Sequence, residues 1–233
     1  MEEAKPKPGR GKLQDQVLAR LRYGIMSGLF VPGQIMSLRK LAERLGTSPM
    51  PVRESLSRLV AANALEELPN RSVRVPILTA ESLTELFEVR CMIEGMATRL
   101  AATNVTQELI GDLQLINDAV KAAHERGQMA EVLSANQEFH FKLYRHAGSH
   151  ILLPIIESLW LRCGPTMYFS LNAPSLWDTA AHIDIIAALQ RNDSSRAQAA
   201  MIDDIMKTGR YLVEQAKSGV TSGPFADLRR PEY

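Results

Sequence analysis

The apolar positions near the start of the chain repeat with a helical period. Between residues 13 and 28 they stand at spacings of four, one, three and four, which places them on one face of a helix. These positions are Leu13, Val17, Leu18, Leu21 and Ile25. Gly28 is a stop signal, and Pro32-Gly33 predicts a turn. The first element is therefore predicted to be an amphipathic helix.

Two shorter helices are predicted next. Ser37 can cap a helix over 38–45, which Gly46 ends, and Ser48 can cap a helix that runs to about residue 62. The break at Gly46-Thr47-Ser48 allows a tight turn, so the pair forms a helix-turn-helix pattern. Residues 64–68 and 72–75 then resemble two short strands around a turn, a β-hairpin that would form a wing.

The rest of the chain is predicted to be helical. Six amphipathic segments fall at 80–102, 106–126, 129–147, 150–170, 176–191 and 194–217. The fold class is therefore mainly α, a winged helix-turn-helix followed by an antiparallel bundle. We divide the chain into a flexible arm (1–12), a winged helix-turn-helix domain (13–76), a helical domain (79–217) and a flexible tail (218–233).

The distribution of charge along the chain supports this division. Residues 1–76 hold 13 of the 27 Lys and Arg and 7 of the 26 Asp and Glu, so the net charge of +1 separates into +6 and −5. A basic first third favours a polyanion as partner, although many domains carry such a charge without binding nucleic acid. No apolar run reaches about 18 residues, so no membrane span is expected. Two cysteines and a polar N-terminus favour the cytoplasm.

The second helix of a helix-turn-helix enters the major groove, and its first residues lie nearest the bases. Arg53 is the best candidate for a bidentate contact to guanine. The other candidates for contact with operator DNA are Arg39, Ser48, Met50, Arg58, Arg71 and Arg74. The alternative is an ordinary helical hairpin with a glycine turn, in which Arg53 forms surface ion pairs.

The motifs point to a known family. Residues 21–28 (LRYGIMSG), 38–46 (LRKLAERLG) and above all 48–56 (SPMPVRESL) resemble the GntR family of bacterial regulators. The resemblance implies a homodimer that binds a short palindromic operator, with a DNA-reading role for Arg39 and Arg53. Pro49 stands where many members have Arg, and the usual wing glycine is absent from Asn70-Arg71-Ser72-Val73.

The second half resembles the FCD ligand-binding domain of FadR-type GntR regulators. The likeness rests on Glu88-Val-Arg90 with Glu94, on residues 136–140 (NQEFH), and on His182 and Ala200-Met201. Six helices rather than seven indicate the VanR-like subgroup. The likeness implies a divalent metal site, which here would be Asn136, His140, His182 and Asp204.

Two of these four depart from the family pattern, because Asn136 stands for the usual Asp and Asp204 for the usual His. The set can still bind zinc, manganese or nickel. The alternative is that His140 and His182 are ordinary hydrogen-bonded core histidines.

The same cavity is expected to bind a small carboxylate effector. Arg90 is a candidate anchor, because Arg pairs with a carboxylate bidentately; Arg162 and Tyr168 are weaker candidates. The alternative for Arg90 is an intrahelical pair with Glu94 at i+4, and both hold if Glu94 orients Arg90.

These inferences favour a transcriptional regulator, a repressor that responds to a metabolite, and not an enzyme. One alternative is a metal-dependent helical hydrolase of the HD type, but His182 and Asp184 are not adjacent. A second is an architectural DNA-binding protein without an effector.

Overall fold

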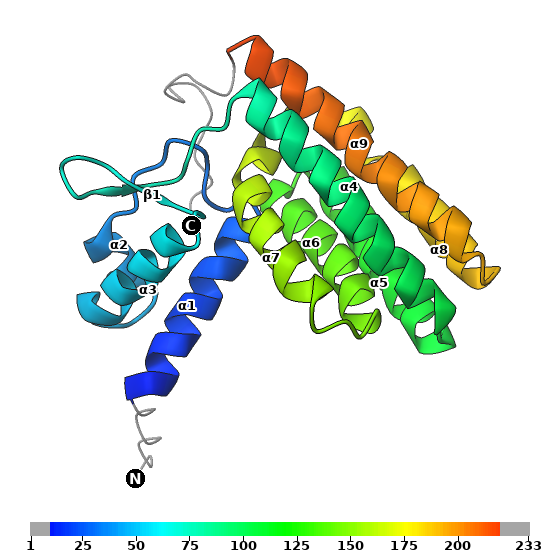
Figure 1. The fold of residues 1–233 in the computed structure, drawn as a ribbon, viewed down its shortest axis with the longest axis horizontal. Helices are drawn as coiled ribbons and strands as arrows, with labels where there is room; N and C mark the ends of the chain where they lie inside the picture. Colours follow the sequence, from blue (N-terminus) through cyan, green and yellow to red (C-terminus); the bar gives the residue numbers. More distant parts are fainter. Residues whose placement is uncertain (1–9, 220–233) are drawn as a thin grey trace.

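The computed structural model describes residues 10–219, which form a winged helix joined to a helical bundle (Figure 1). In the first part the elements are α1 (Arg10–Met26), α2 (Leu38–Arg44), α3 (Pro49–Ala61), β1 (Glu66–Glu67) and β2 (Val73–Arg74). Because α1 begins at Arg10, the end of the predicted arm is helical. The remainder of the arm and residues 220–233 of the tail lie outside the described residues.

The core of the winged helix forms where the apolar face of α1 packs on α3. The fully buried side chains include Val17, Leu21 and Ile25 from α1, and Val52 and Leu59 from α3. These are positions that the helical spacing placed on one face. The hydrophobic pattern therefore sets which sides of α1 and α3 meet.

The two predicted caps behave differently. Ser37 caps α2, because its hydroxyl accepts a hydrogen bond from the Lys40 backbone N–H. Ser48 is the N-cap residue of α3, but its side chain makes no capping bond. The third residue of α3 is Pro51, which lacks the N–H that such a bond requires.

The wing is shorter than predicted. β1 and β2 are antiparallel, and Glu66 lies opposite Arg74. The predicted strand residues Ala64, Leu65 and Val75 are buried against the core instead of extending the ladder. At the tip Arg71 adopts a φ of 62°, a left-handed conformation in which glycine would be unstrained.

The bundle contains the six α-helices that the described residues form after the wing. They are α4 (Ala80–Thr103), α5 (Gln107–Glu125), α6 (Met129–His146), α7 (Leu152–Cys163), α8 (Ala180–Gln190) and α9 (Ser194–Lys217). The long helices α4 and α9 lie side by side (Figure 1). Gly209 lets them approach closely, since a Cβ there would lie 2.7 Å from the Phe87 ring.

Two predicted segments are not continuous helices. The segment 150–170 is α7 followed by the 3-10 helix η1 (Gly164–Asn172), because Pro165 cannot donate to the carbonyl four residues back. The segment 176–191 begins with the 3-10 helix η2 (Pro174–Trp177) and reaches α8 only after Thr179, whose φ is 58°.

The start of η1 is also where the bundle contacts the winged helix. Gly164 packs directly on the end of α1, where a Cβ would lie 2.4 Å from the Ile25 carbonyl oxygen. An ion pair of 2.6 Å joins Arg22 of α1 to Glu157 of α7 nearby. None of the helices in the described part of the chain has the length and apolar character needed to cross a membrane.

We expect Gly164→Ala to lower the free energy of unfolding by about 1–3 kcal/mol, because a methyl group here meets backbone atoms that cannot rotate away. Gly111→Ala is the matched control: a Cβ at this α5 position meets nothing within 4 Å, and the substitution should stabilise the helix by up to about 1 kcal/mol. Urea denaturation of the three proteins measures both changes. Equal midpoints for the two variants would contradict the close packing described above.

Candidate functional site

The start of α3 presents an open, polar surface. Ser48, Met50 and Arg53 are exposed there, and Arg39 is exposed on α2. Among the described residues neither arginine side chain forms an ion pair, and the Ser48 hydroxyl has no capping role. These side chains are therefore available for a ligand outside the chain.

The remaining predicted DNA contacts are more constrained. Arg58 lies 3.8 Å from the Asp15 carboxylate in an exposed pair, which is a weak interaction. Arg74 is held across the wing by Glu66, with Nε–Oε1 and Nη2–Oε1 distances of 2.8 and 2.7 Å. Arg71 is exposed at the wing tip. Of the two wing arginines, only the exposed Arg71 forms no ion pair among the described residues.

A cavity inside the bundle brings together all four predicted metal ligands. Asn136 and His140 lie one turn apart on α6, His182 is on α8 and Asp204 on α9, and all four line this cavity. One ligand atom from each of His140, His182 and Asp204 lies within 4.8 Å of the others. Side chains from three helices thus converge on a volume that one cation could occupy.

The hydrogen bonding of His182 leaves one ring nitrogen for a ligand. Its Nδ1 donates to the Asn117 side-chain oxygen at 3.0 Å, and the ring stacks on Phe139 at a centroid distance of 3.8 Å. Burial lowers the pKa of His182 to about 4, so the ring is neutral at pH 7. A neutral imidazole with its proton on Nδ1 offers the Nε2 lone pair, the form that binds metals.

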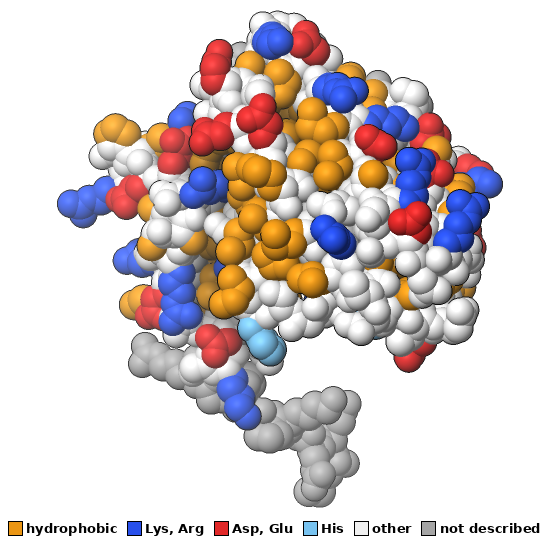
Figure 2. Space-filling view, turned by 45° about the vertical axis from the view of Figure 1, so that its right-hand side comes forward, with side chains coloured by type: hydrophobic (Ala, Val, Ile, Leu, Met, Phe, Trp, Pro, Cys, Tyr) orange, Lys and Arg blue, Asp and Glu red, His pale blue; other side chains and the backbone are white. Residues whose placement is uncertain are grey.

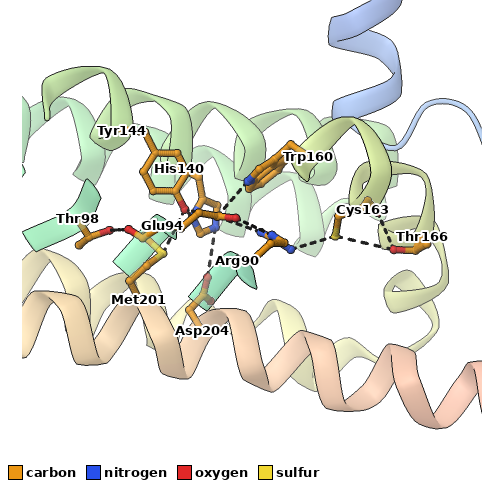
Figure 3. A network of polar contacts seen from close by, with 10 residues as sticks. All are labelled: Arg90, Glu94, Thr98, His140, Tyr144, Trp160, Cys163, Thr166, Met201 and Asp204. Atoms are coloured by element: carbon orange, nitrogen blue, oxygen red, sulfur yellow. Dashed lines mark hydrogen bonds and ion pairs between the residues drawn. The ribbon is translucent and has the colours of Figure 1, made fainter. Parts of the chain in front are cut away.

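His140 is oriented in the same way by a longer chain of hydrogen bonds (Figure 3). The Tyr144 hydroxyl donates to Glu94 Oε2 at 2.6 Å, so its oxygen is free to accept from His140 Nδ1 at 3.2 Å. His140 Nε2 then faces Asp204 Oδ2 at 3.3 Å. A lone pair facing a carboxylate is repulsive unless a proton or a metal cation lies between them, so this pair favours bound positive charge.

Asp204 is held in its anionic form. Burial by itself raises the pKa of this carboxyl, but a hydrogen bond from His140, in the form of the ring that carries a proton on Nε2, and the positive charge of the nearby Arg90 outweigh it. The pKa therefore lies below its ordinary value. An anionic oxygen and two imidazole nitrogens are suitable ligands for zinc, manganese or nickel.

Arg90 forms the intrahelical pair with Glu94, and its role as an effector anchor stays a prediction. Its Nε and Nη2 donate to the two oxygens of Glu94 at 2.6 and 3.2 Å, and its Nη1 donates to Cys163 Sγ at 3.0 Å. Arg90 also lines the cavity. Since a guanidinium has five N–H groups, two remain for a ligand. Glu94 thus positions Arg90 without using all its donors.

The other two predicted effector contacts do not line this cavity. Arg162 is exposed beside Asn63, Pro76 and Leu78, in a separate hollow next to the winged helix. Tyr168 is half-buried and packs edge-on against Phe169. For Tyr168 the physical reason is the change from α7 to η1 at Gly164, which rotates the following residues, so that Met167 lines the cavity instead.

Two residues of the site, one behind His182 and one on the cavity wall, were missed from the sequence. Asn117 stands at a core position of α5 between Leu113 and Val120, and a polar residue on an apolar face was a signal that it is functional. Trp160, whose indole donates to Glu94 Oε2 at 3.0 Å, gave no such signal.

The segment between η1 and α8 covers the cavity. Leu176, Trp177, Asp178 and Thr179 line it, and Asp178 is held to Lys207 of α9 by an ion pair of 3.0 Å. The free space in the cavity is about 30 Å³, which admits a cation or one to two waters. A larger ligand requires this segment to move.

The chain matches two known domain families. Residues 13–75 match the family described as "Bacterial regulatory proteins, gntR family", and residues 85–206 match the FCD domain. The two matches correspond to the winged helix and to the bundle that holds the cavity.

Individual proteins resemble the chain over most of its length. The HTH-type transcriptional regulator McbR of Escherichia coli (strain K12) is 31% identical over 89% of this chain and 98% of its own. The solved structure of E. coli McbR/YncC superimposes with a TM-score of 0.81, covering 87% of this chain and 98% of that one. The probable D-xylose utilization operon transcriptional repressor of Paenarthrobacter nicotinovorans is 29% identical over 90% of this chain and 91% of its own.

We expect Glu94→Gln to destabilise the protein by about 3–5 kcal/mol, because it leaves the Arg90 guanidinium buried without a countercharge. The amide also presents a donor to groups that themselves donate. Glu138→Gln is the control, since the Glu138 pair with Arg145 is about half exposed at 3.7 Å and should cost less than about 1 kcal/mol. Free energies of unfolding in urea test this. A cost for Glu94→Gln as small as that of the control would show that the buried pair does not organise the bundle.

Proposed function

Because this chain belongs to the GntR family of bacterial regulators and carries an FCD domain, we propose that it represses a palindromic operator as a homodimer and responds to a small carboxylate metabolite. That it is a transcriptional regulator, and not an enzyme, follows from the family and from relatives that are named regulators and repressors. Neither the hydrolase nor the architectural alternative has support among these relatives.

DNA reading is assigned to the exposed start of α3. The observation that carries this proposal is that Arg53 projects there without an intrachain ion pair among the described residues, on a helix whose first turn is open to solvent. Arg53 is the candidate for guanine in the major groove, with Arg39 as a second reader. Ser48 contributes a hydroxyl to phosphate, and Arg71 approaches the backbone or the minor groove.

A divalent cation is proposed between Asn136, His140, His182 and Asp204. The support is the pair of oriented imidazoles and the anionic carboxylate, with Asn117 and Tyr144 fixing the tautomers from behind. Outer hydrogen bonds of this kind are typical of histidines that bind metals. When bound, the cation would supply a Lewis-acid centre for an anionic oxygen of the effector.

The effector class follows from the charges on the cavity wall. Arg90 retains two N–H groups, and if a cation were held in the same cavity by Asn136, His140, His182 and Asp204, the two positive charges would suit a small carboxylate. Trp177 and Met167 close the cavity with apolar surface, so the remainder of the ligand is expected to be compact. Because the free space is small, entry of the effector displaces the segment that carries Leu176 to Thr179.

Arg53→Ala should weaken binding to the DNA upstream of its own gene by about 5- to 150-fold, equivalent to about 1–3 kcal/mol, and should reduce the preference over a shuffled sequence. Fluorescence anisotropy at fixed salt measures both. Arg191→Ala, an exposed arginine of the bundle, is the control and should bind as the wild type does. If Arg53→Ala left both the affinity and the sequence preference unchanged, Arg53 would not be the residue that recognises the DNA bases.

Protein purified without chelator should contain about one zinc, manganese or nickel per chain by elemental analysis, and His182→Ala should lose it. His150→Ala, an exposed histidine outside the cavity, should retain it. In a thermal-shift screen, a small carboxylate should raise the melting temperature of the metal-loaded wild type and have little effect after chelation. Full metal content in His182→Ala would contradict the proposed ligand set.

A further inference from the structure

The residue just before α8 has an unusual backbone conformation. Thr179 adopts a φ of 58°, and it is buried on the wall of the bundle cavity. The other non-glycine residues with a positive φ in the described part of the chain are Asn63, Arg71 and Asn192, and all three are exposed. A β-branched residue is strained in this conformation, because its Cβ lies too close to the backbone. The packing around Thr179 must therefore hold it there.

Thr179 lies at the end of the segment that covers the cavity. We name η2 (Pro174–Trp177) together with Asp178 the lid. Trp177 is only 6% exposed, and its indole N–H donates to the Ser170 carbonyl oxygen at 3.0 Å. Hydrophobic side chains do remain exposed in a band on one face of the molecule (Figure 2), whereas Trp177 is turned inward against the cavity. The lid thus closes the cavity with an apolar side chain that opening would expose.

An ion pair fastens the lid to α9. Lys207 Nζ lies 3.0 and 3.1 Å from the two carboxylate oxygens of Asp178. The same carboxylate accepts a hydrogen bond from the Ala180 backbone N–H at 3.1 Å, while the Thr179 side chain makes no capping bond to α8. The two side chains of the pair are exposed by 51% and 35%, and an ion pair in such a position contributes little to stability. It can therefore break without unfolding the bundle.

We propose that the lid opens as a unit by rotation at Thr179, and that the ion pair between Asp178 and Lys207 is its latch. In the closed state the latch and the burial of Trp177 hold Thr179 in the left-handed conformation. Opening lets Thr179 return to an ordinary backbone conformation, and the release of strain offsets part of the cost of exposing Trp177. Backbone strain at ligand clamps and switch segments commonly has such a role.

The lid is the entrance to the cavity in this proposal. The free space of about 30 Å³ is too small for a carboxylate metabolite while the lid is closed, so the lid must open before the metabolite binds. This part of the inference rests on the proposed function, because it assumes that a ligand enters. The opening itself is a property of the chain without any ligand, so the two can be tested separately.

The latch is tested by hydrogen–deuterium exchange of the full chain after chelation, with mass spectrometry of peptides that cover residues 174–183. Lys207→Met should raise the exchange of these peptides by about two- to fivefold, the effect expected for loss of a half-exposed ion pair. Lys217→Met is the matched control on the same helix, because its pair with Glu214 does not contact the lid. Equal exchange of peptides from α5 shows that each variant is folded. Unchanged exchange of the lid in Lys207→Met would overturn the latch.

The hinge is tested by comparing Thr179→Gly with Thr179→Ala in the same experiment. Both variants lack the threonine hydroxyl and methyl groups, but only alanine keeps the Cβ that strains a left-handed residue. After correction for intrinsic exchange rates, the lid should therefore open at least about threefold less readily in Thr179→Gly. At a residue without strain the order is reversed, because glycine adds backbone freedom to the open segment. Exchange in Thr179→Gly that equals or exceeds that in Thr179→Ala would overturn Thr179 as the hinge.

The role of the lid as an entrance is tested with zinc as the probe. Transfer of bound zinc to the chromogenic chelator 4-(2-pyridylazo)resorcinol should be about two- to fivefold faster from Lys207→Met than from wild type or Lys217→Met. Removal of a positive charge one turn from Asp204 would by itself hold the cation more tightly and slow its release, so faster release identifies the latch. Equal or slower release would overturn the lid as the entrance. A wild type that retains no zinc would contradict the proposed metal site, and the exchange experiments would still decide whether the lid opens.

Discussion

The bundle is organised around the buried carboxylate of Glu94. It accepts hydrogen bonds from Arg90 on its own helix, from Tyr144 of α6 and from Trp160 of α7. A buried charge is costly unless it is paired and fully hydrogen-bonded. The three helices must therefore meet with these side chains in register, and this requirement constrains the cavity beside them.

The same carboxylate connects the cavity with the contact to the winged helix. Through Tyr144 it orients His140 toward Asp204, and through Arg90 it reaches Cys163. The residue after Cys163 is Gly164, whose backbone lies against the end of α1. A ligand that moved Arg90 would act one residue from this contact. The arrangement gives a short physical route for the coupling between effector and operator that allosteric regulation requires.

Local features were predictable where local physics determines them. The helical spacing identified α1. Ser37 was predicted to cap the next helix, and in the structure the Lys40 backbone N–H donates to its hydroxyl. The four residues Asn136, His140, His182 and Asp204 came from a family resemblance, and the structure places them around one cavity. Ser48 failed as a capping side chain because of Pro51. Tyr168 lies away from the cavity because the predicted α-helix ends before Pro165, beyond which the side chains face different surroundings.

The sequence by itself determined the class of protein, the order of its domains and the residues that face the core, because periodicity and motif spacing are properties of neighbouring positions. It did not determine which N–H groups of Arg90 bind Glu94 and which remain for the cavity. Nor did it determine that Asn117 and Tyr144 form hydrogen bonds with the two histidines. The contacts that set these relations include Tyr144 with Glu94 and His182 with Asn117, which are 50 and 65 positions apart in the chain. Only the tertiary structure, by packing six helices around one buried carboxylate and one cavity, decided them.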